Sequence, residues 1–323
     1  MRKVIKLMTV AFLTVIFLAA CGGNNNEAAN EETNQNKDTG NSNGEIQVVT
    51  SFTLIEDMVR EIGGDKVELR NLVPIGTDPH EYDPLPDGIK AATDADVLFY
   101  NGFNLEGGDH GWFANMMYSV EQDWDVAFEL TEGVEPLYLT NEDGKDEEIN
   151  PHAFLDPTVG IQMAENTLDA LIEVDPNNKE YYEENADQYL TALKNMDEQY
   201  HERINDIPEG DRILITSERA YQYIAKRYGL TEGYIWAIDT EENGSPEQIT
   251  SIIEFIEERQ PPVLFLETNV DPRPMETVSS ETGIEIYGEV FSDEIGKPGE
   301  EGGTYLKFLQ YNIDMIYDGL TSN

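Results

Sequence analysis

The sequence predicts an α/β protein in which two lobes with parallel sheets are joined by one long, rigid helix. Short apolar stretches alternate with amphipathic segments both before residue 175 and after residue 208, as in parallel β/α units. Between them, residues 178–205 contain neither Gly nor Pro and keep one helical face apolar. At 1.5 Å per residue this helix is about 40 Å long, which is more than a single β/α unit needs. A helix of this length fits a connection between two lobes as well as it fits an ordinary surface helix.

The first residues have the form of a secretory signal. Arg2, Lys3 and Lys6 precede an apolar run over residues 7–17, too short to span a membrane, and Cys21 follows Ala20. This end resembles the lipobox of bacterial lipoproteins, which implies cleavage after residue 20 and a lipid on Cys21. The alternative is a chance Cys beside an ordinary cleavage site. Cys21 is the only Cys in the chain, so the folded part has no disulfide and no thiolate ligand.

The rest of the chain divides by composition. Residues 22–44 are almost entirely polar and cannot bury a core, so residues 21–44 are predicted to be a lipidated Cys with a disordered tether. We expect a first lobe over residues 45–175, a linking helix over 176–207 and a second lobe over 208–323. The lipid anchor places the protein on the extracytoplasmic face of a bacterial plasma membrane, with no other contact with the membrane.

The first lobe is predicted from its strand and helix signals. Strands are expected over residues 46–50, 67–73 and 97–100, and helices over 54–62 and 89–93. An acidic loop is expected over residues 141–148. Asp156 followed by Pro157 is a helix start, an N-cap with Pro at the first helical position, and this helix runs to about residue 173.

The second lobe repeats the alternation. Strands are expected over residues 212–216, 263–266 and 284–290, with helices over 219–228, 271–281 and 304–320. Ser245 and Gln248 form a capping box, with Pro246 at the first helical position, for a helix to about residue 258. No sequence repeat relates the two lobes.

The chain is strongly acidic, with a formal net charge of -45 at pH 7. Such a surface repels phosphates, which argues against nucleic acid as a partner. A solvated surface suited to a saline or alkaline medium explains most of these charges better than a surface that concentrates cations, because salt screens the field within about 8 Å.

Two loops carry a His between prolines, and both lie in the first lobe. His80 follows Pro79 and precedes Pro84, and His152 follows Pro151 and precedes Pro157. Proline restricts its own φ and the residue before it, so both loops are stiff. In the second lobe, Glu218 and Asp293 each follow a predicted strand, where ligands of α/β proteins bind. These four residues are therefore candidate metal ligands in a cleft between the lobes.

Other conspicuous side chains have plainer explanations. His110 is not expected to bind metal, and His201 is expected to face solvent. Glu81, Asp83 and Asp156 are expected to orient loops or imidazoles. Trp112 and Trp236 are expected in the core or between the lobes.

Several motifs resemble the zinc/manganese solute-binding lipoproteins of bacterial ABC transporters. They comprise residues 234–238 with 240–242, the capping box at 245–248, Asp271-Pro272-Arg273-Pro274-Met275, and Val290-Phe291-Ser292-Asp293. The resemblance extends over residues 45–320 and is greatest to the manganese branch. It implies two lobes bridged by a backbone helix, with one metal ion between them, bound at the positions of His80, His152, Glu218 and Asp293.

The implied function is a receptor, not an enzyme, that captures Mn(II) and delivers it to an ABC permease driven by a cytoplasmic ATPase. Two imidazoles and two carboxylates suit Mn(II), whereas a third imidazole would favour Zn(II). Zn(II) nevertheless binds most N/O sites more tightly and is expected to bind in vitro. Iron is a lesser candidate. The folded part is expected to be monomeric.

Three alternatives to this function stay open. They are a zinc receptor of the same family, an adhesin whose metal only stabilises the fold, and a metallohydrolase. No His-Glu-x-x-His motif is present to support the last.

Overall fold

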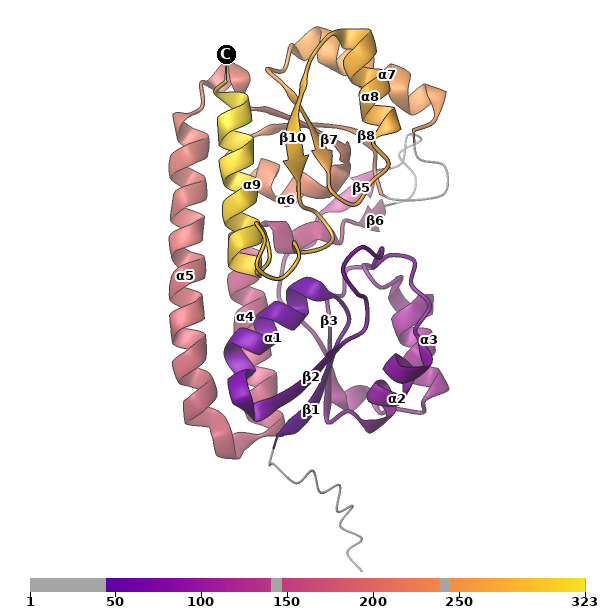
Figure 1. The fold of residues 1–323 in the computed structure, drawn as a ribbon, viewed down its shortest axis with the longest axis vertical. Helices are drawn as coiled ribbons and strands as arrows, with labels where there is room; N and C mark the ends of the chain where they lie inside the picture. The colour runs from indigo at the N-terminus through magenta and orange to yellow at the C-terminus, as the bar shows by residue number, and fades with distance from the viewer. Residues whose placement is uncertain (1–44, 141–146, 239–243, 323) are drawn as a thin grey trace, which may run out of the picture. The chain divides into compact units, whose positions relative to one another are not determined.

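A four-stranded parallel sheet forms the centre of the first lobe in the computed structural model, which describes residues 45–140, 147–238 and 244–322 (Figure 1). Its strand order is β2-β1-β3-β4, from β1 (Ile46–Thr50), β2 (Val67–Asn71), β3 (Val97–Tyr100) and β4 (Ala127–Glu129). Its helices are α1 (Thr53–Gly63), α2 (Pro86–Asp94) and α3 (Trp112–Ser119). The parallel sheet of the first lobe is thus confirmed.

The connection to the long helix contains a short hairpin and one helix. β5 (Tyr138–Thr140) pairs antiparallel with β6 (Glu147–Ile149), at the ends of the predicted acidic loop, whose residues 141–146 lie outside the described part of the chain. α4 (Pro157–Val174) follows, and the side chain of Asp156 accepts a hydrogen bond from the Thr158 N–H at 2.8 Å, as its predicted capping role requires.

The second lobe contains two parallel strand pairs. β7 (Ile213–Glu218) pairs with β8 (Thr231–Trp236), β9 (Leu264–Glu267) pairs with β10 (Ile286–Val290), and β7 packs beside β9. Its helices are α6 (Gln222–Tyr228), α7 (Pro246–Arg259), α8 (Arg273–Thr282) and α9 (Tyr305–Leu320). The predicted capping box at Ser245 and Gln248 is present.

α5 (Lys179–Asp206) is the predicted long helix, and it packs against α1, α4, α6 and α9 (Figure 1). The apolar positions that predicted it are all buried, and they are Tyr182, Ala186, Tyr189, Leu193, Met196, Tyr200 and Ile204. The hydroxyl of Tyr200 donates to the Leu309 carbonyl at 2.8 Å, and the amide of Asn185 donates to the Ile62 carbonyl at 3.1 Å. The helix is therefore attached to elements of both lobes.

A second attachment between the lobes is the segment from residue 291 to 304, which connects β10 to α9. The Ile295 N–H donates to the Thr53 hydroxyl at 3.2 Å, and the Tyr305 N–H donates to the Asp57 carboxylate at 2.7 Å. The Tyr305 ring lies against Gly160 of α4, where a Cβ atom would stand 2.5 Å from its hydroxyl oxygen. This segment is thus fastened to α1 and α4 of the first lobe.

Several elements differ from the sequence expectations. α2 starts at Pro86 because Pro fits the first helical position, and the first turn of the predicted helix at 219 is a 3-10 turn. β4, β5, β6, α3 and β8 were not predicted from the sequence. β4, β5 and β6 have three residues each, too few to show an alternation of apolar and polar residues. The apolar residues of α3 follow no clear helical period, and Gly233 interrupts the strand pattern of β8.

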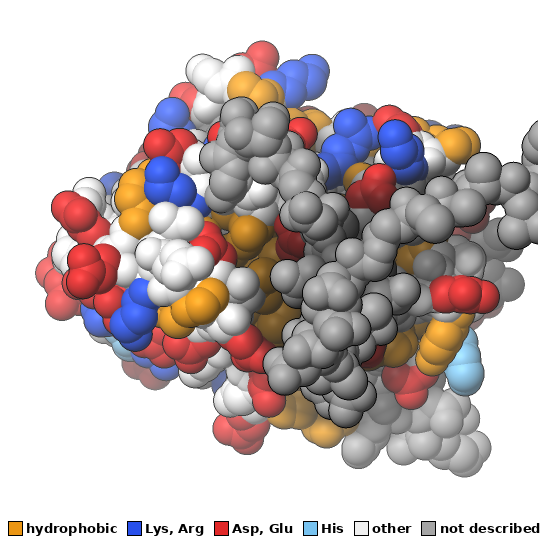
Figure 2. Space-filling view, turned by 90° about the horizontal axis from the view of Figure 1, so that it is seen from below, with side chains coloured by type: hydrophobic (Ala, Val, Ile, Leu, Met, Phe, Trp, Pro, Cys, Tyr) orange, Lys and Arg blue, Asp and Glu red, His pale blue; other side chains and the backbone are white. Residues whose placement is uncertain are grey.

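The described surface mixes both signs of charge. Figure 2 shows Asp and Glu side chains distributed over one face with Lys and Arg between them. Within the described ranges, the helices are all too short or too polar to cross a bilayer. The signal segment, Cys21 and the tether lie outside those ranges.

Candidate metal site

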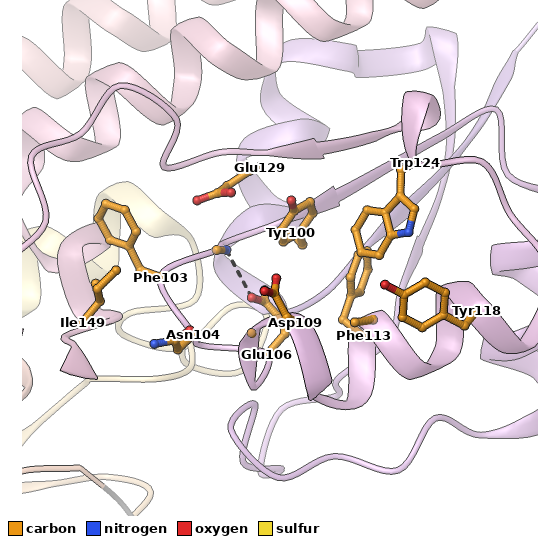
Figure 3. Close-up of a pocket in the computed structure, with 13 residues that line it drawn as sticks. Tyr100, Phe103, Asn104, Glu106, Asp109, Phe113, Tyr118, Trp124, Glu129 and Ile149 are labelled. Atoms are coloured by element: carbon orange, nitrogen blue, oxygen red, sulfur yellow. Dashed lines mark hydrogen bonds between the residues drawn. The ribbon is translucent and has the colours of Figure 1, made fainter. Parts of the chain in front are cut away.

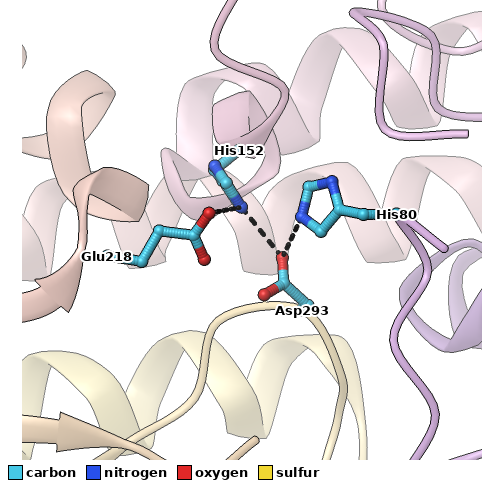
Figure 4. A group of neighbouring side chains, drawn as sticks. All are labelled: His80, His152, Glu218 and Asp293. Carbon is cyan, nitrogen blue, oxygen red and sulfur yellow. Dashed lines mark ion pairs between the residues drawn. The ribbon is translucent and has the colours of Figure 1, made fainter. Parts of the chain in front are cut away.

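The four predicted side chains converge on one point. His80, His152, Glu218 and Asp293 each direct one nitrogen or oxygen atom inward, and these atoms all lie within 4.8 Å of one another (Figure 4). Two ligand atoms on opposite sides of an ion with bonds of 2.0–2.2 Å lie up to about 4.4 Å apart. The arrangement therefore needs a contraction of only a few tenths of an ångström to hold a divalent cation.

His152 is fixed by its neighbour Asn150. The side-chain oxygen of Asn150 lies 2.8 Å from Nδ1 of His152 and accepts the backbone N–H of the same residue at 3.0 Å. The carbonyl of Pro151 accepts a hydrogen bond from Asn101 at 3.1 Å, which fastens the segment to the end of β3. With Nδ1 occupied, Nε2 of His152 is the atom that faces the other ligands.

His80 lies in a loop that its surroundings hold from two sides. The Asp78 carboxylate accepts the His80 N–H at 2.7 Å, and the Trp112 indole donates to the Pro79 carbonyl at 2.8 Å. The Tyr82 ring packs edge-on against Trp112 with 5.2 Å between centroids. The prediction that Trp112 is a core residue is confirmed, and its N–H additionally supports the His80 loop.

Glu218 is the last residue of β7 rather than a residue beyond it, and it is fully buried. The carboxylate of Glu267, at the end of β9, accepts the N–H groups of Ser217 at 3.0 Å and of Glu218 at 2.8 Å. Burial raises the pKa of Glu267 to about 7, although these two N–H groups oppose the shift. Glu267 thus fixes the position of the Glu218 backbone.

Asp293 lies three residues beyond β10, in the segment that is fastened to α1. Its Oδ2 accepts hydrogen bonds from the Asn269 amide at 2.9 Å and the Ser292 hydroxyl at 3.1 Å. Its Oδ1 lies 3.0 Å from Nε2 of His152 and 3.7 Å from Nε2 of His80. One oxygen is held by the protein, and the other faces the centre of the site.

The site is closed to solvent. The side chains of His152 and Glu218 are 0% exposed, that of Asp293 is 2% exposed, and that of His80 is 7% exposed. Burial lowers the pKa of His152. Burial also opposes protonation of His80, but Asp293, Glu218 and Asp78 together outweigh it and raise the pKa of His80 to about 10. The two imidazoles, in turn, hold the pKa of Asp293 well below its usual range despite its burial.

The donor set fits a cation. Nε2 of His80, Nε2 of His152 and Oδ1 of Asp293 are buried atoms that make no hydrogen bond of acceptable geometry with the described residues, although Nε2 of His152 lies 3.0 Å from Oδ1 of Asp293. Buried polar atoms are ordinarily satisfied, so several of them facing one point require a charge or a polar ligand there.

The remaining predicted residues lie apart from this point. His201 is exposed, as expected, and packs edge-on against Tyr228. His110 is exposed as well. Glu81 and Asp83 are exposed, and Trp236 is buried in the apolar core of the second lobe.

Neither Asn150, Glu267 nor Asn269 was singled out from the sequence. Glu267 carried a usable signal, because it ends an apolar strand just as Glu218 does.

A separate cavity of about 400 Å³ lies in the first lobe (Figure 3). Its walls include stacked Tyr100 and Phe113 rings, with centroids 4.8 Å apart, and the carboxylate of Glu106. Glu106 is buried and accepts hydrogen bonds from the Ser51 hydroxyl at 2.6 Å and the Asn101 N–H at 2.7 Å. These bonds hold the loop whose Asn101 supports the His152 segment, so this wall of the cavity supports the candidate metal site.

Comparisons with known proteins agree with this architecture. Residues 48–319 match the model of the ZnuA family, described as zinc-uptake complex component A, periplasmic. The chain belongs to this family of metal-binding proteins. It is 40% identical, over 98% of its length and 99% of the relative's, to the manganese ABC transporter substrate-binding lipoprotein PsaA of Streptococcus mitis. It is also 39% identical, over 99% of both chains, to the iron ABC transporter substrate-binding lipoprotein MtsA of Streptococcus pyogenes.

Solved structures show the same fold. A Mn-bound mutant of the periplasmic metal-binding protein of Candidatus Liberibacter asiaticus matches with a TM-score of 0.77 and 29% identity over 84% of this chain and 98% of that one. The periplasmic zinc-binding protein TroA of Treponema pallidum matches with a TM-score of 0.77 and 25% identity over 86% and 99%. The predicted fold class and family are thereby confirmed.

Proposed function

We propose that this protein is the extracytoplasmic receptor of an ABC-type metal importer, and that it captures one Mn(II) ion with His80, His152, Glu218 and Asp293. The observation that carries the proposal is the convergence of these four buried ligand atoms within 4.8 Å. The relatives named as substrate-binding lipoproteins of ABC transporters support the receptor role and imply a permease and an ATPase as partners. Binding is coordination without turnover.

The choice of metal rests on the ligand set. Two imidazoles with two carboxylates suit Mn(II), and the carboxylates neutralise the charge of the ion, which lowers the cost of burying it. Zn(II) is the competitor, because it binds most such sites more tightly and because TroA is named for zinc. Replacing Glu218 with His is expected to move the preference toward Zn(II).

Metal analysis of the protein as isolated, followed by competition between Mn(II) and Zn(II), tests the identity of the ion. His152→Ala tests the site. It is expected to remove high-affinity binding without unfolding the protein, whereas His201→Ala, the matched exposed His, retains binding. Undiminished binding by His152→Ala would overturn the ligand assignment.

The proposed location follows from the signal segment. We propose that residues 1–20 are removed, that Cys21 carries a lipid and that residues 22–44 tether a monomeric folded part, with lobes over 45–175 and 208–323 linked through 176–207. Cys21→Ser is expected to release the protein from the membrane fraction into the medium. Retention of this variant on the membrane would contradict the anchor.

A further inference from the structure

We propose that Asn150 is a positioning residue, whose side-chain amide sets the tautomer of His152 and joins that imidazole to the backbone following Glu218. This inference rests on the proposed function, because His152 and Glu218 are two of the proposed metal ligands. The observations that carry it are the hydrogen bonds of one buried amide.

The orientation of the Asn150 amide is determined by its partners. Its NH2 group donates to the Arg219 carbonyl at 2.8 Å and to Oε1 of Gln222 at 3.0 Å. The Gln222 amide is itself oriented, because its own NH2 group donates to the Tyr138 carbonyl at 3.2 Å. The oxygen of Asn150 must therefore face His152.

That orientation decides which nitrogen of His152 carries the hydrogen. The Asn150 oxygen can only accept, so Nδ1 of His152, 2.8 Å away, is the donor. In the neutral imidazole the other nitrogen, Nε2, then has its lone pair free for a metal ion. A His that binds metal through Nε2 needs this tautomer, and a hydrogen bond to its other nitrogen is the usual means of fixing it.

The same amide connects the two lobes at the site. Arg219 directly follows Glu218, so the carbonyl that accepts from Asn150 lies on the segment that presents Glu218. The backbone of Asn150 is also held, because its N–H donates to the Leu137 carbonyl at 2.8 Å and its carbonyl accepts from the Tyr223 hydroxyl at 2.9 Å. The relative position of His152 and Glu218 thus depends in part on this side chain.

Burial makes the arrangement costly to change. Asn150 is 0% exposed, and all the hydrogen bonds of its amide are to protein groups. Rotating the amide by a half-turn would place its NH2 group against the His152 N–H and its oxygen against two acceptors. Buried groups left unsatisfied in this way are strongly disfavoured.

Two substitutions separate the two roles of the amide. Asn150→Leu has a similar size and makes none of these bonds. Asn150→Asp keeps an oxygen for His152 but has no hydrogen for Arg219 or Gln222. The matched control is Asn166→Leu, because the Asn166 amide also makes several hydrogen bonds to protein groups, to the Leu130 and Glu132 carbonyls at 2.9 Å each and from Gln162 at 3.0 Å.

The first measurement is the tautomer of His152 in the metal-free protein, read from the nitrogen and carbon chemical shifts of a histidine-labelled sample. Wild type, Asn166→Leu and Asn150→Asp are expected to show hydrogen on Nδ1, and Asn150→Leu a mixture of both tautomers. The second measurement is Mn(II) affinity, which should fall about 10–100-fold in Asn150→Leu and by less in Asn150→Asp.

Hydrogen on Nε2 in the wild type would overturn the proposal, as would an Asn150→Leu variant with unchanged tautomer and affinity. If Asn150→Leu does not fold, as judged by circular dichroism, the tautomer of folded Asn150→Asp decides, because loss of the Nδ1 hydrogen there contradicts the assigned role. The tautomer is measured without metal, so failure of the wild type to bind Mn(II) would refute the proposed function and leave this test intact.

Discussion

Nε2 of His152 lies 3.0 Å from Oδ1 of Asp293. If the hydrogen of His152 is on Nδ1, 2.8 Å from the Asn150 oxygen as proposed above, two lone pairs face each other across this distance. Two acceptors this close need a positive charge nearby. In the metal-free protein His80 supplies it, because its pKa is raised to about 10 by Asp293, Glu218 and Asp78 against the effect of burial.

The first prediction concerns pH. Because the folded, metal-free protein keeps His80 protonated below about pH 10, a metal ion must displace that proton. Apparent affinity for Mn(II) should therefore rise about tenfold per pH unit from pH 6.5 to 8.5 and weaken in acid. Calorimetry in buffers of different ionisation enthalpy should detect about one proton released per ion. An affinity that is flat over this range would contradict the charge assignment.

The second prediction concerns Glu267→Gln. Both carboxylate oxygens of Glu267 accept backbone N–H groups, and a Gln side chain would present its NH2 group to one of them. The end of β7 should shift and carry Glu218 with it, weakening Mn(II) binding by about 10–100-fold. Asp96→Asn, which alters a half-buried carboxylate that accepts the Gln47 N–H at 2.8 Å, is the control and should retain wild-type affinity. Equal affinity of Glu267→Gln and wild type would show that Glu218 does not depend on Glu267.

The third prediction concerns metal exchange. The Glu294 carboxylate accepts the Gly76 N–H, which joins the loop of Asp293 to the loop of His80. His80 is also the most exposed of the four side chains, so we expect metal to enter on its side. Glu294→Ala should speed both association and dissociation of Mn(II), changing each rate more than it changes their ratio. Stopped-flow mixing with a chelator measures this, and Glu300→Ala, an exposed position on the same segment, should leave both rates unchanged.

The fourth prediction concerns stability. Burial raises the pKa of Asp57 from 3.8 to about 6, although the Tyr305 N–H opposes the shift. The folded state then binds more protons than the unfolded state between these values, so stability falls as pH rises from about 4 to 6. Asp57→Asn should remove this dependence and stabilise the protein above pH 6, by at most about 3 kcal/mol. Thermal unfolding at pH 4.5 and 8 tests it, and equal destabilisation at both values would be the contrary result.

Much of the fold, and the identity of the four candidate ligands, could be predicted from the sequence. The apolar face of α5 and the caps at Asp156 and Ser245 are local patterns, and the structure contains them. His80 and His152 stood out because prolines flank them.

The supporting residues could not be predicted in the same way. Asn150, Glu267 and Asn269 act through partners distant in the chain, and a single sequence does not show which distant groups will meet. The attachment of the Asp293 segment to α1 is of the same kind.

The attachment of the Asp293 segment also bears on the order of folding. The Thr53–Ile295 and Asp57–Tyr305 hydrogen bonds join groups 242 and 248 residues apart. During synthesis the N-terminus is made first, so the first lobe cannot form all of its contacts until almost the whole chain has been made. Contacts of such long range slow folding and leave α1 without its final partner for most of that time. A chain truncated before α9 would lack the Tyr305 contact with α1, so its N-terminal half should be an unstable product that proteases remove.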